Sequence, residues 1–287
     1  MIPATFEYAA PNTLEEAISL LHEYGDEAKI LSGGHSLIPM MKLRFAEPEF
    51  LVDINNIPGL AYVKEEGGML KIGGLTRESE LEHSEAAKNG FRIFQDVTKL
   101  IADPQVRNMG TIGGNLAHGD AANDHPAVML ALNASVVATG KDGQRTIPID
   151  EFFHGFYMTA LEHGEILTEI QIPIPASGTG NAYHKLERKV GDYATAGAAV
   201  QITMDGDTCV DIGIGLTNVS PVPVRAARSE AALKGQKLTE ELIAQAAQMA
   251  GEDCEPSEDL RGDEEYKRAM VAVLVKRMIK KAIERAS

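Results

Sequence analysis

Apolar and polar positions alternate with a helical period near the beginning of the chain. Four apolar residues follow the i, i+3, i+4, i+7 spacing of an amphipathic helix: Leu14, Ala17, Ile18 and Leu21. Thr13 stands where a capping side chain is needed, and Gly25 stands where a helix commonly ends. The pattern therefore predicts a helix over residues 14–24.

Short runs of apolar and β-branched residues between turn-forming residues predict the strands of the first part of the chain. These runs cover 29–31, 51–54, 61–64, 69–72, 134–139 and 166–172. Helical patterns between them cover 78–87, 91–101 and 126–132. Residues 103–124 show no regular period and are rich in Gly, Asp and Asn, and long irregular loops of this kind are usually functional.

A cluster of Pro, Gly and Ser at 173–180 predicts a domain boundary near residue 176. Beyond it, strand-like runs cover 182–189, 196–204 and 208–216. Helical segments follow at 228–233, 240–250 and 263–285. We therefore predict an α+β protein whose C-terminal domain is a three-stranded antiparallel sheet covered by helices.

Length, charge and apolar content limit the classes of function that the chain can have. The length of 287 residues suits two domains, and the net charge of −15 argues against nucleic-acid binding. The basic run 276–281 fits the solvated face of the last helix, with a local basic patch as the alternative. We expect a cytoplasmic protein with no transmembrane segment, because no apolar run is long enough to cross a bilayer and residues 1–11 lack a signal-peptide pattern.

The two cysteines, Cys209 and Cys254, lie far apart and neither belongs to a CxxC pair. A disulfide framework and a Cys-ligated zinc or iron–sulfur site are therefore excluded within this chain. Reduced, buried thiols in a cytosolic protein are the expectation.

Two glycine-bearing loops are the main candidates for chemistry: 32–36 (SGGHS), directly after a predicted strand, and 110–115 (GTIGGN). Glycine lets the backbone approach a ligand closely, and consecutive N–H groups can then surround a phosphate oxygen. Two such loops together would form a phosphate cradle without a helix dipole, although each alone is also typical of a tight turn. The chain has neither a Rossmann G-x-G-x-x-G after a strand nor a P-loop.

Two further segments leave alternatives open. The segment 118–125 (HGDAANDH) holds two His and two carboxylates that could ligate a divalent ion. Their spacing matches no H-E-x-x-H or EF-hand template, and the favoured alternative is a loop that faces ribose and phosphate. In the strand that begins near 182, Tyr183, Lys185, Glu187 and Lys189 share one face. That face is either solvated at a sheet edge or, if interior, must offer Lys185 an anionic or acceptor partner.

The two loops and their surroundings resemble the flavin motifs of a known family. SGGHSLIPMMKLRFAEPEFLVDINNIPGL (32–60) and ADPQVRNMGTIGGNLAHGDAANDHPA (102–127) are similar to the two flavin motifs of the medium subunits of molybdenum hydroxylases, the xanthine dehydrogenase and aerobic carbon monoxide dehydrogenase family. KLERKVGDYATAGAAV (185–200) and CEPSEDLRGDEEYKRAM (254–270) resemble its C-terminal domain. The resemblance covers essentially the whole chain and is strongest to the carbon monoxide dehydrogenase branch.

The resemblance implies a fold and a set of FAD contacts. Residues 1–176 would form the two-lobed FAD-binding fold shared with vanillyl-alcohol oxidase (the PCMH type), with lobes of about 1–57 and 58–176, and 177–287 would form the C-terminal α+β domain. The cofactor-binding residues would be Ser32, Gly33, Gly34, His35, Ser36, Leu37, Ile101, Gly110, Thr111, Gly113, Gly114, Asn115, Ala117, Asp124, Ile166, Leu167, Lys185 and Tyr193.

Within this set the resemblance assigns roles. The two loops would contact the pyrophosphate, Asp124 the adenosine ribose, Lys185 the ring end of the flavin and Tyr193 the isoalloxazine. The chain departs from the family pattern at Ser32, where Ala is frequent, and at Ala121, where Pro is common, which leaves the role of Asp120 open.

The resemblance also implies partners. A small subunit with [2Fe–2S] clusters and a large molybdenum subunit would complete a heterotrimer, itself part of a dimer of heterotrimers. In the carbon monoxide dehydrogenase branch, CO and water would become CO2 at molybdenum. The electrons would pass through the clusters to FAD here and on to an external acceptor such as a quinone.

This chain would then hold no metal and no catalytic acid or base, and any association with the inner face of the cytoplasmic membrane would come through the complex. A stand-alone FAD-dependent oxidoreductase of the same fold and a flavin-free scaffold are the alternatives.

Overall fold

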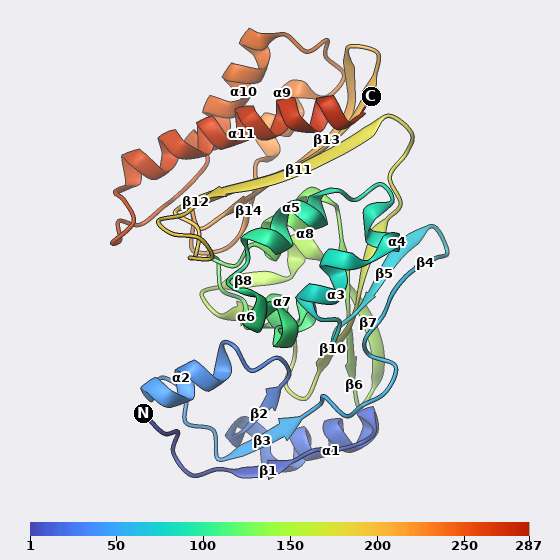
Figure 1. Ribbon diagram of the computed structural model, residues 1–287, viewed down its shortest axis with the longest axis vertical. Helices are drawn as coiled ribbons and strands as arrows, with labels where there is room; N and C mark the ends of the chain where they lie inside the picture. Colours follow the sequence, from blue (N-terminus) through green and yellow to red (C-terminus); the bar gives the residue numbers. More distant parts are fainter. Residues whose placement is uncertain (287) are drawn as a thin grey trace.

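The computed structural model describes residues 1–286. Figure 1 shows three groups of elements stacked along the long axis: an N-terminal lobe in blue, a central region in green, and a C-terminal region from yellow to red. Each group has a hydrophobic cluster of its own.

The N-terminal lobe is a three-stranded parallel sheet with two helices. Its elements are β1 (Glu7–Ala9), α1 (Leu14–Tyr24), a 3-10 turn at Gly25–Glu27, β2 (Ala28–Leu31), α2 (Leu37–Leu43) and β3 (Phe50–Asp53), with strand order β1-β3-β2. The predicted helix 14–24 is confirmed, and its apolar stripe is buried. The Thr13 hydroxyl accepts a hydrogen bond from the Glu16 N–H at 3.2 Å, and Gly25 ends the helix at φ 57°.

The central region contains a five-stranded antiparallel sheet. Its strands, in spatial order, are β4 (Val63–Glu66), β5 (Met69–Gly73), β10 (Ile166–Pro173), β6 (Ser135–Gly140) and β7 (Gly143–Pro148). A separate two-stranded ribbon, β8 (Phe153–Gly155) and β9 (Met158–Thr159), follows a 3-10 turn at Ile149–Glu151 and contacts α7. The hairpin predicted around 65–68 is present and turns at Gly67 and Gly68, both with positive φ.

Six short helices accompany this sheet: α3 (Glu78–His83), α4 (Glu85–Lys88), α5 (Ile93–Leu100), α6 (Pro104–Met109), α7 (Ile112–His118) and α8 (His125–Ala131). The expectation that 103–124 is irregular is wrong, because α6 and α7 lie within it. Asp103 and Thr111 cap these helices with their side chains. Glycine is a poor helix former, so Gly113 and Gly114 conceal α7 in the sequence.

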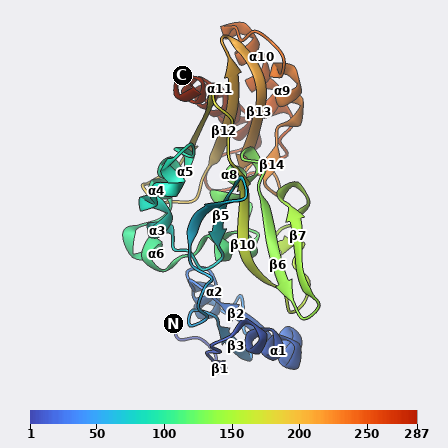
Figure 2. The same cartoon turned by 90° about the vertical axis from the view of Figure 1, so that its right-hand side faces the viewer.

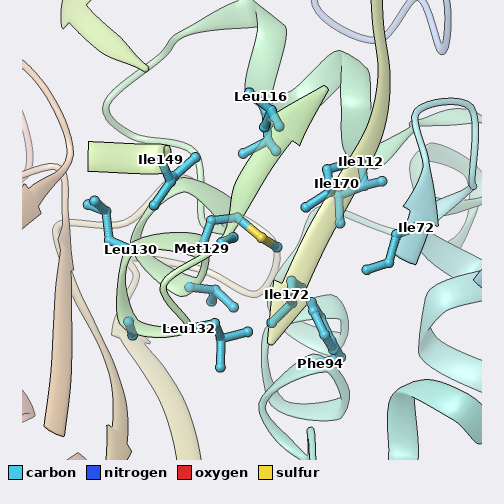
Figure 3. Close-up of a cluster of buried hydrophobic side chains, with 14 of the residues drawn as sticks. Ile72, Phe94, Ile112, Leu116, Met129, Leu130, Leu132, Ile149, Ile170 and Ile172 are labelled. Carbon is cyan, nitrogen blue, oxygen red and sulfur yellow. The ribbon is translucent and has the colours of Figure 1, made fainter. Parts of the chain in front are cut away.

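The main core lies between the central sheet and the C-terminal region. Helix α8 is buried at every position, as expected of a helix that is apolar on all sides. Figure 3 shows Met129 of α8 between Leu130 and Ile149 on one side and Ile170 and Ile172 on the other. Glycines allow the opposite face of α8 to lie directly on the next sheet: a Cβ at 213 would be 2.3 Å from the Ala131 carbonyl oxygen.

The C-terminal region is an antiparallel sheet covered by helices. The strand order is β11 (Thr179–Leu186), β12 (Ala196–Asp205), β13 (Thr208–Thr217) and β14 (Val224–Arg225). The three predicted strands are present, and the two-residue β14 adds a fourth. Helices α9 (Ala227–Leu233), α10 (Glu240–Glu252) and α11 (Glu264–Ala286) follow, with α11 across β11 and β12 (Figure 2).

The structure also bears on the predictions for the basic run, the two cysteines and membrane-spanning segments. The basic run lies on α11, where Lys276 and Lys280 face Glu240 at 3.9 and 2.6 Å. Both cysteines are free and buried, as predicted. Within residues 1–286, no helix combines the length and the apolar character needed to cross a membrane.

Candidate cofactor-binding site

A cavity of about 540 Å³ lies where the three groups of elements meet. Every residue of the predicted site lines it, including both glycine loops, Asp124, Lys185 and Tyr193. Segments far apart in the sequence are therefore brought to one place: the end of β2, the start of α7, the start of β10 and the end of β11. A cavity of this size suits a small organic ligand.

The cavity has further lining residues that were not predicted: Lys29, Ile30, Ile54, Gly74, Glu78, Ala102, Val106, His118, Asn123, Thr159, Leu161, Glu165, Gly191 and Asp192. Gly74 follows a strand in a Gly-Gly pair, as the glycines of the first loop do, and Gly191 and Asp192 directly precede Tyr193. The Gly-Gly pair and the position next to Tyr193 are sequence signals from which these residues could have been predicted. Glu78 and Glu165 come to the cavity only through tertiary packing and leave no local signal.

The first glycine loop connects β2 to α2 and presents its backbone to the cavity. Within the described chain, no group accepts a hydrogen bond from the backbone N–H of Gly33, Gly34, His35 or Ser36. Gly34 has φ 73°, a conformation that glycine adopts without strain. Four consecutive free donors at a cavity wall are suited to an anionic oxygen ligand.

The second glycine loop differs from the expectation. Five of its N–H groups are already used inside the protein. Ile112 donates to the Thr76 carbonyl, Gly113 to the Gly74 carbonyl at 3.0 Å and Gly114 to the Thr111 hydroxyl at 3.1 Å, while Gly110 and Asn115 donate to the Val106 and Thr111 carbonyls. Both loops also lead directly into helices, α2 and α7, so the prediction of a cradle without helix N-termini is wrong. The Asn115 Oδ1 atom is a buried side-chain oxygen of this loop without a hydrogen-bond partner among the described residues.

The glycines of the two loops allow close backbone contacts, with the second loop at Gly33 and with Gly74 after β5 at Gly113. A Cβ on Gly33 would be 2.6 Å from the Met109 carbonyl oxygen and 2.7 Å from the Gly110 Cα. A Cβ on Gly113 would be 2.4 Å from the Gly74 carbonyl oxygen. The Ser32 and Thr111 hydroxyls then join the loops with a hydrogen bond of 2.7 Å.

A buried charged group closes the cavity on the side of the C-terminal sheet. The Lys185 ammonium donates to Asp124 Oδ2 at 2.8 Å, and the Tyr183 hydroxyl donates to Asp124 Oδ1. Burial raises the pKa of Asp124, while Lys185 and Tyr183 act in the opposite direction. Burial and the neighbouring carboxylate raise the pKa of Tyr183 well above its ordinary value, so this hydroxyl remains a donor.

This pairing settles one alternative and revises another. Lys185 is 3% exposed, so the solvated-face interpretation of its strand is wrong. Asp124 and Lys185 touch each other and therefore cannot contact opposite ends of an extended dinucleotide. Asp124 therefore cannot contact the adenosine ribose while Lys185 contacts the flavin ring. Both residues face the same part of any ligand.

Aromatic and acidic groups surround another part of the wall. The rings of His118 and Tyr157 lie 4.8 Å apart, and the Tyr157 hydroxyl lies 3.5 Å from Asp120 Oδ2. Burial lowers the pKa of His118, which favours its neutral form. Burial, followed by the Asp120 carboxylate, raises the pKa of Tyr193 to about 12.

The His and Asp side chains of 118–125 face different partners. His125 Nε2 lies 2.6 Å from Glu78 Oε2, whereas Asp124 is held by Lys185 and Tyr183. Across residues 1–286, no three His, Cys, Asp or Glu side chains converge as a metal site would require. The segment therefore serves the cavity wall and the core behind it.

The donor set fits FAD. Free backbone N–H groups at 33–36 suit a pyrophosphate, and the unpaired Asn115 amide oxygen suits a hydroxyl or ring N–H donor. Ile101, Ile166 and Leu167 provide apolar surface for a ring system, and Lys185 provides a buried cation. The chemistry of the wall thus matches a ligand with a charged centre and flat aromatic parts.

Comparisons with known proteins agree with this site. A family model described as the FAD binding domain in molybdopterin dehydrogenase matches residues 4–175, and the CO dehydrogenase flavoprotein C-terminal domain matches 181–282. The carbon monoxide dehydrogenase medium chain of Hydrogenophaga pseudoflava is 50% identical over 287 residues, covering all of both chains. The 6-hydroxypseudooxynicotine dehydrogenase complex subunit alpha of Paenarthrobacter nicotinovorans is 36% identical, covering 100% of this chain and 97% of its own length.

A solved structure of carbon monoxide dehydrogenase from Hydrogenophaga pseudoflava, which lacks the Mo-pyranopterin moiety of the molybdenum cofactor, superposes with a TM-score of 0.98. The two chains are 52% identical, and all of each is covered. The predicted fold class, including the PCMH-type FAD-binding fold, is confirmed. The chain therefore belongs to the FAD-binding flavoprotein subunits of the molybdopterin dehydrogenase family.

Proposed function

We propose that this chain is the FAD-carrying electron-transfer subunit of an aerobic carbon monoxide dehydrogenase. The supporting observation is a single cavity that collects both glycine loops and a buried Lys–Asp pair, in a chain 50% identical over its full length to a carbon monoxide dehydrogenase medium chain. A relative at 36% identity is named for a different substrate, so the general flavin role is supported more broadly than the substrate.

The proposed site residues divide by chemistry. The N–H groups of 33–36 would hold the pyrophosphate, with Thr111 and Asn115 of the second loop beside them. Lys185 would place positive charge next to the flavin, and Asp124 and Tyr183 would fix its position. When bound, FAD supplies redox chemistry that accepts and releases electrons singly or in pairs.

The domain division is part of the proposal. We assign 1–176 to the FAD-binding domain, with lobes of about 1–57 and 58–176, and 177–287 to the C-terminal domain. The separate hydrophobic clusters of the N-terminal lobe and of the C-terminal sheet and helices support this division. The site then lies where these units meet, a frequent location for ligand sites.

The partners follow from the family. We propose a small [2Fe–2S] subunit and a large molybdenum subunit, assembled as a dimer of heterotrimers, with a quinone as the external electron acceptor. The two free, buried cysteines agree with a reducing cytoplasmic location. The assembled complex, and not this chain alone, would associate with the inner face of the cytoplasmic membrane, where it would meet the quinone.

The substrate can be tested on the complex purified with all its subunits. We expect CO to bleach the flavin absorbance of the wild-type complex without added reductant. A complex containing Asn115→Asp should lose flavin and CO-dependent reduction of an added quinone, while CO still reduces the iron–sulfur clusters. If CO reduces nothing but another small molecule does, the substrate assignment is wrong and the flavin role stands.

A further inference from the structure

Arg77 and Asn55 form a hydrogen-bonded connection outside the cavity, between the two glycine loops. One Arg77 guanidinium nitrogen, Nη2, donates to Asn55 Oδ1 at 2.6 Å, and the other, Nη1, donates to the Met109 carbonyl oxygen. Asn55 Nδ2 in turn donates to the Ser32 carbonyl oxygen at 2.9 Å. The connection runs from the first residue of the first loop to the residue just before the second loop.

We infer that Arg77 and Asn55, hereafter the loop clamp, are positioning residues that hold the two glycine loops in the arrangement that binds the FAD pyrophosphate. This inference rests on the proposed function. Neither residue lines the cavity, so the loop clamp acts through the backbone of the loops and not by touching the ligand.

Asn55 sets the direction of the peptide group between Ser32 and Gly33. The N–H of Gly33 and the carbonyl of Ser32 belong to the same trans peptide and therefore point in opposite directions. Asn55 fixes the Ser32 carbonyl on its own side. The Gly33 N–H, which has no acceptor among the described residues, is thereby directed away from Asn55 and left free for a ligand.

Arg77 acts where the two loops touch. The Met109 carbonyl that accepts from Arg77 is also the group against which Gly33 packs, since a Cβ there would lie 2.6 Å from its oxygen. Arg77 also pairs with Thr111 in an isolated antiparallel bridge. One guanidinium therefore fixes the second loop at the point where the first loop rests on it.

Asp53 orients the side chain of Asn55. Asp53 Oδ1 accepts from both the backbone N–H and the side-chain Nδ2 of Asn55, at 2.9 and 2.6 Å. These bonds leave Oδ1 of Asn55 to face Arg77 and direct Nδ2 at Ser32. The planar, multi-donor guanidinium suits this arrangement, whereas a Lys ammonium could not reproduce two divergent bonds with the same geometry.

The test is FAD titration of the full-length apo-protein, with flavin fluorescence as the measure of binding. We compare wild type, Arg77→Met, Arg77→Lys, Asn55→Asp and the double variant Arg77→Met/Asn55→Asp, and measure the urea unfolding of each apo-protein alongside. Asn55→Asp keeps an oxygen facing Arg77 but removes the donor to Ser32. Arg228→Met is the control, because Arg228 also donates to a side-chain oxygen, that of Asp253, but on the surface and far from the loops.

We expect Arg77→Met and Asn55→Asp each to raise the FAD dissociation constant roughly tenfold, with Arg77→Lys between them and wild type. The double variant should lose little more than one single variant, because both residues act through one connection. Arg228→Met should bind FAD as wild type does. Should Arg77→Met fail to fold, Asn55→Asp and Arg77→Lys decide the question.

Wild-type binding separates the two levels of the proposal. If the folded wild-type chain takes up no FAD, either alone or assembled with the iron–sulfur and molybdenum subunits, the proposed function fails. If wild type binds and the folded variants bind equally well, the loop clamp does not position the loops. An affinity loss matched by an equal loss of unfolding free energy would reduce the loop clamp to general fold stability and also overturn the inference.

Discussion

The Lys185 ammonium lies 2.8 Å from Asp124 Oδ2, with 1% and 7% of the two side chains exposed. One residue is on β11 and the other precedes α8, so the pair joins the C-terminal sheet to the central region at the cavity wall. A buried pair of this kind fixes geometry, and loss of one partner leaves an uncompensated charge in the interior.

The pair predicts a specific pattern of stability in the apo-protein. Lys185→Met should lower the free energy of unfolding by about 3 kcal/mol, because Asp124 then lacks its counter-charge. The double variant Lys185→Met/Asp124→Asn should recover part of this loss. Urea unfolding measures both, with Lys234→Met as the control, since Lys234 pairs with Asp211 on the surface and should change stability by less than about 1 kcal/mol. Losses that simply add in the double variant would contradict a coupled pair.

Contact between the glycine loops predicts the effect of one methyl group. In Gly33→Ala the new Cβ would meet backbone atoms of Met109 and Gly110 that cannot move independently. The loops should separate, with a cost of about 1–3 kcal/mol in FAD binding free energy. Gly155→Ala is the matched control, because its Cβ would make only ordinary contacts with Met158. FAD titration of both variants checks this, and wild-type affinity in Gly33→Ala would show that the loops can adapt.

Asp96 predicts a pH dependence of stability. It receives hydrogen bonds from Arg285 at 2.6 Å and Lys281 at 3.3 Å, which join α5 to α11. Burial alone would raise the pKa of Asp96, but Arg285 and its other partners hold it below the ordinary value. The resulting stabilisation is therefore present above the unfolded pKa of about 3.9 and is lost as the pH falls through the lower folded value.

Asp96→Asn should accordingly lower the urea midpoint at pH 7, and its difference from wild type should shrink below about pH 4. Asp207→Asn, which removes a surface partner of Lys237, should have little effect at either pH. A difference between Asp96→Asn and wild type that stays constant from pH 7 to pH 3 would argue against the lowered pKa.

The two buried thiols are expected to react slowly with thiol reagents. Burial raises the pKa of Cys209 to about 11 and that of Cys254 to about 12. Both should therefore react slowly with a thiol reagent at pH 8 in the folded chain and completely in urea. Quantifying labelled cysteine by mass spectrometry tests this, and rapid labelling of either residue in the native protein would show that its surroundings open.

Much of the fold could be predicted because its elements carry strong local patterns. Helix 14–24 has a regular apolar stripe with a cap and a glycine stop, and the three long C-terminal strands are rich in buried apolar residues. The missed strands lack such patterns. In β7 only Ile147 is buried, and β1, β8, β9 and β14 have three residues or fewer.

The site was predictable where a family motif marks it and not where tertiary packing creates it. The glycine loops were visible in the sequence, but their contact with each other, and the use of their N–H groups, depends on how β2, α6 and α7 meet. The pairing of Lys185 with Asp124 likewise joins residues 61 positions apart. No local pattern contains that information.

The central claim is that the cavity holds FAD, and flavin stoichiometry tests it most directly. The full-length chain is incubated with FAD, separated from free flavin and measured by its visible spectrum. Two variants are measured beside it: Asn115→Asp, and the control Asn12→Asp, which adds the same negative charge at an exposed position. We expect one flavin per chain in wild type and Asn12→Asp. In Asn115→Asp we expect affinity to fall roughly tenfold or more, because the added carboxylate repels the phosphates. A folded wild-type chain that holds no flavin, alone or with the iron–sulfur and molybdenum subunits, would contradict the account.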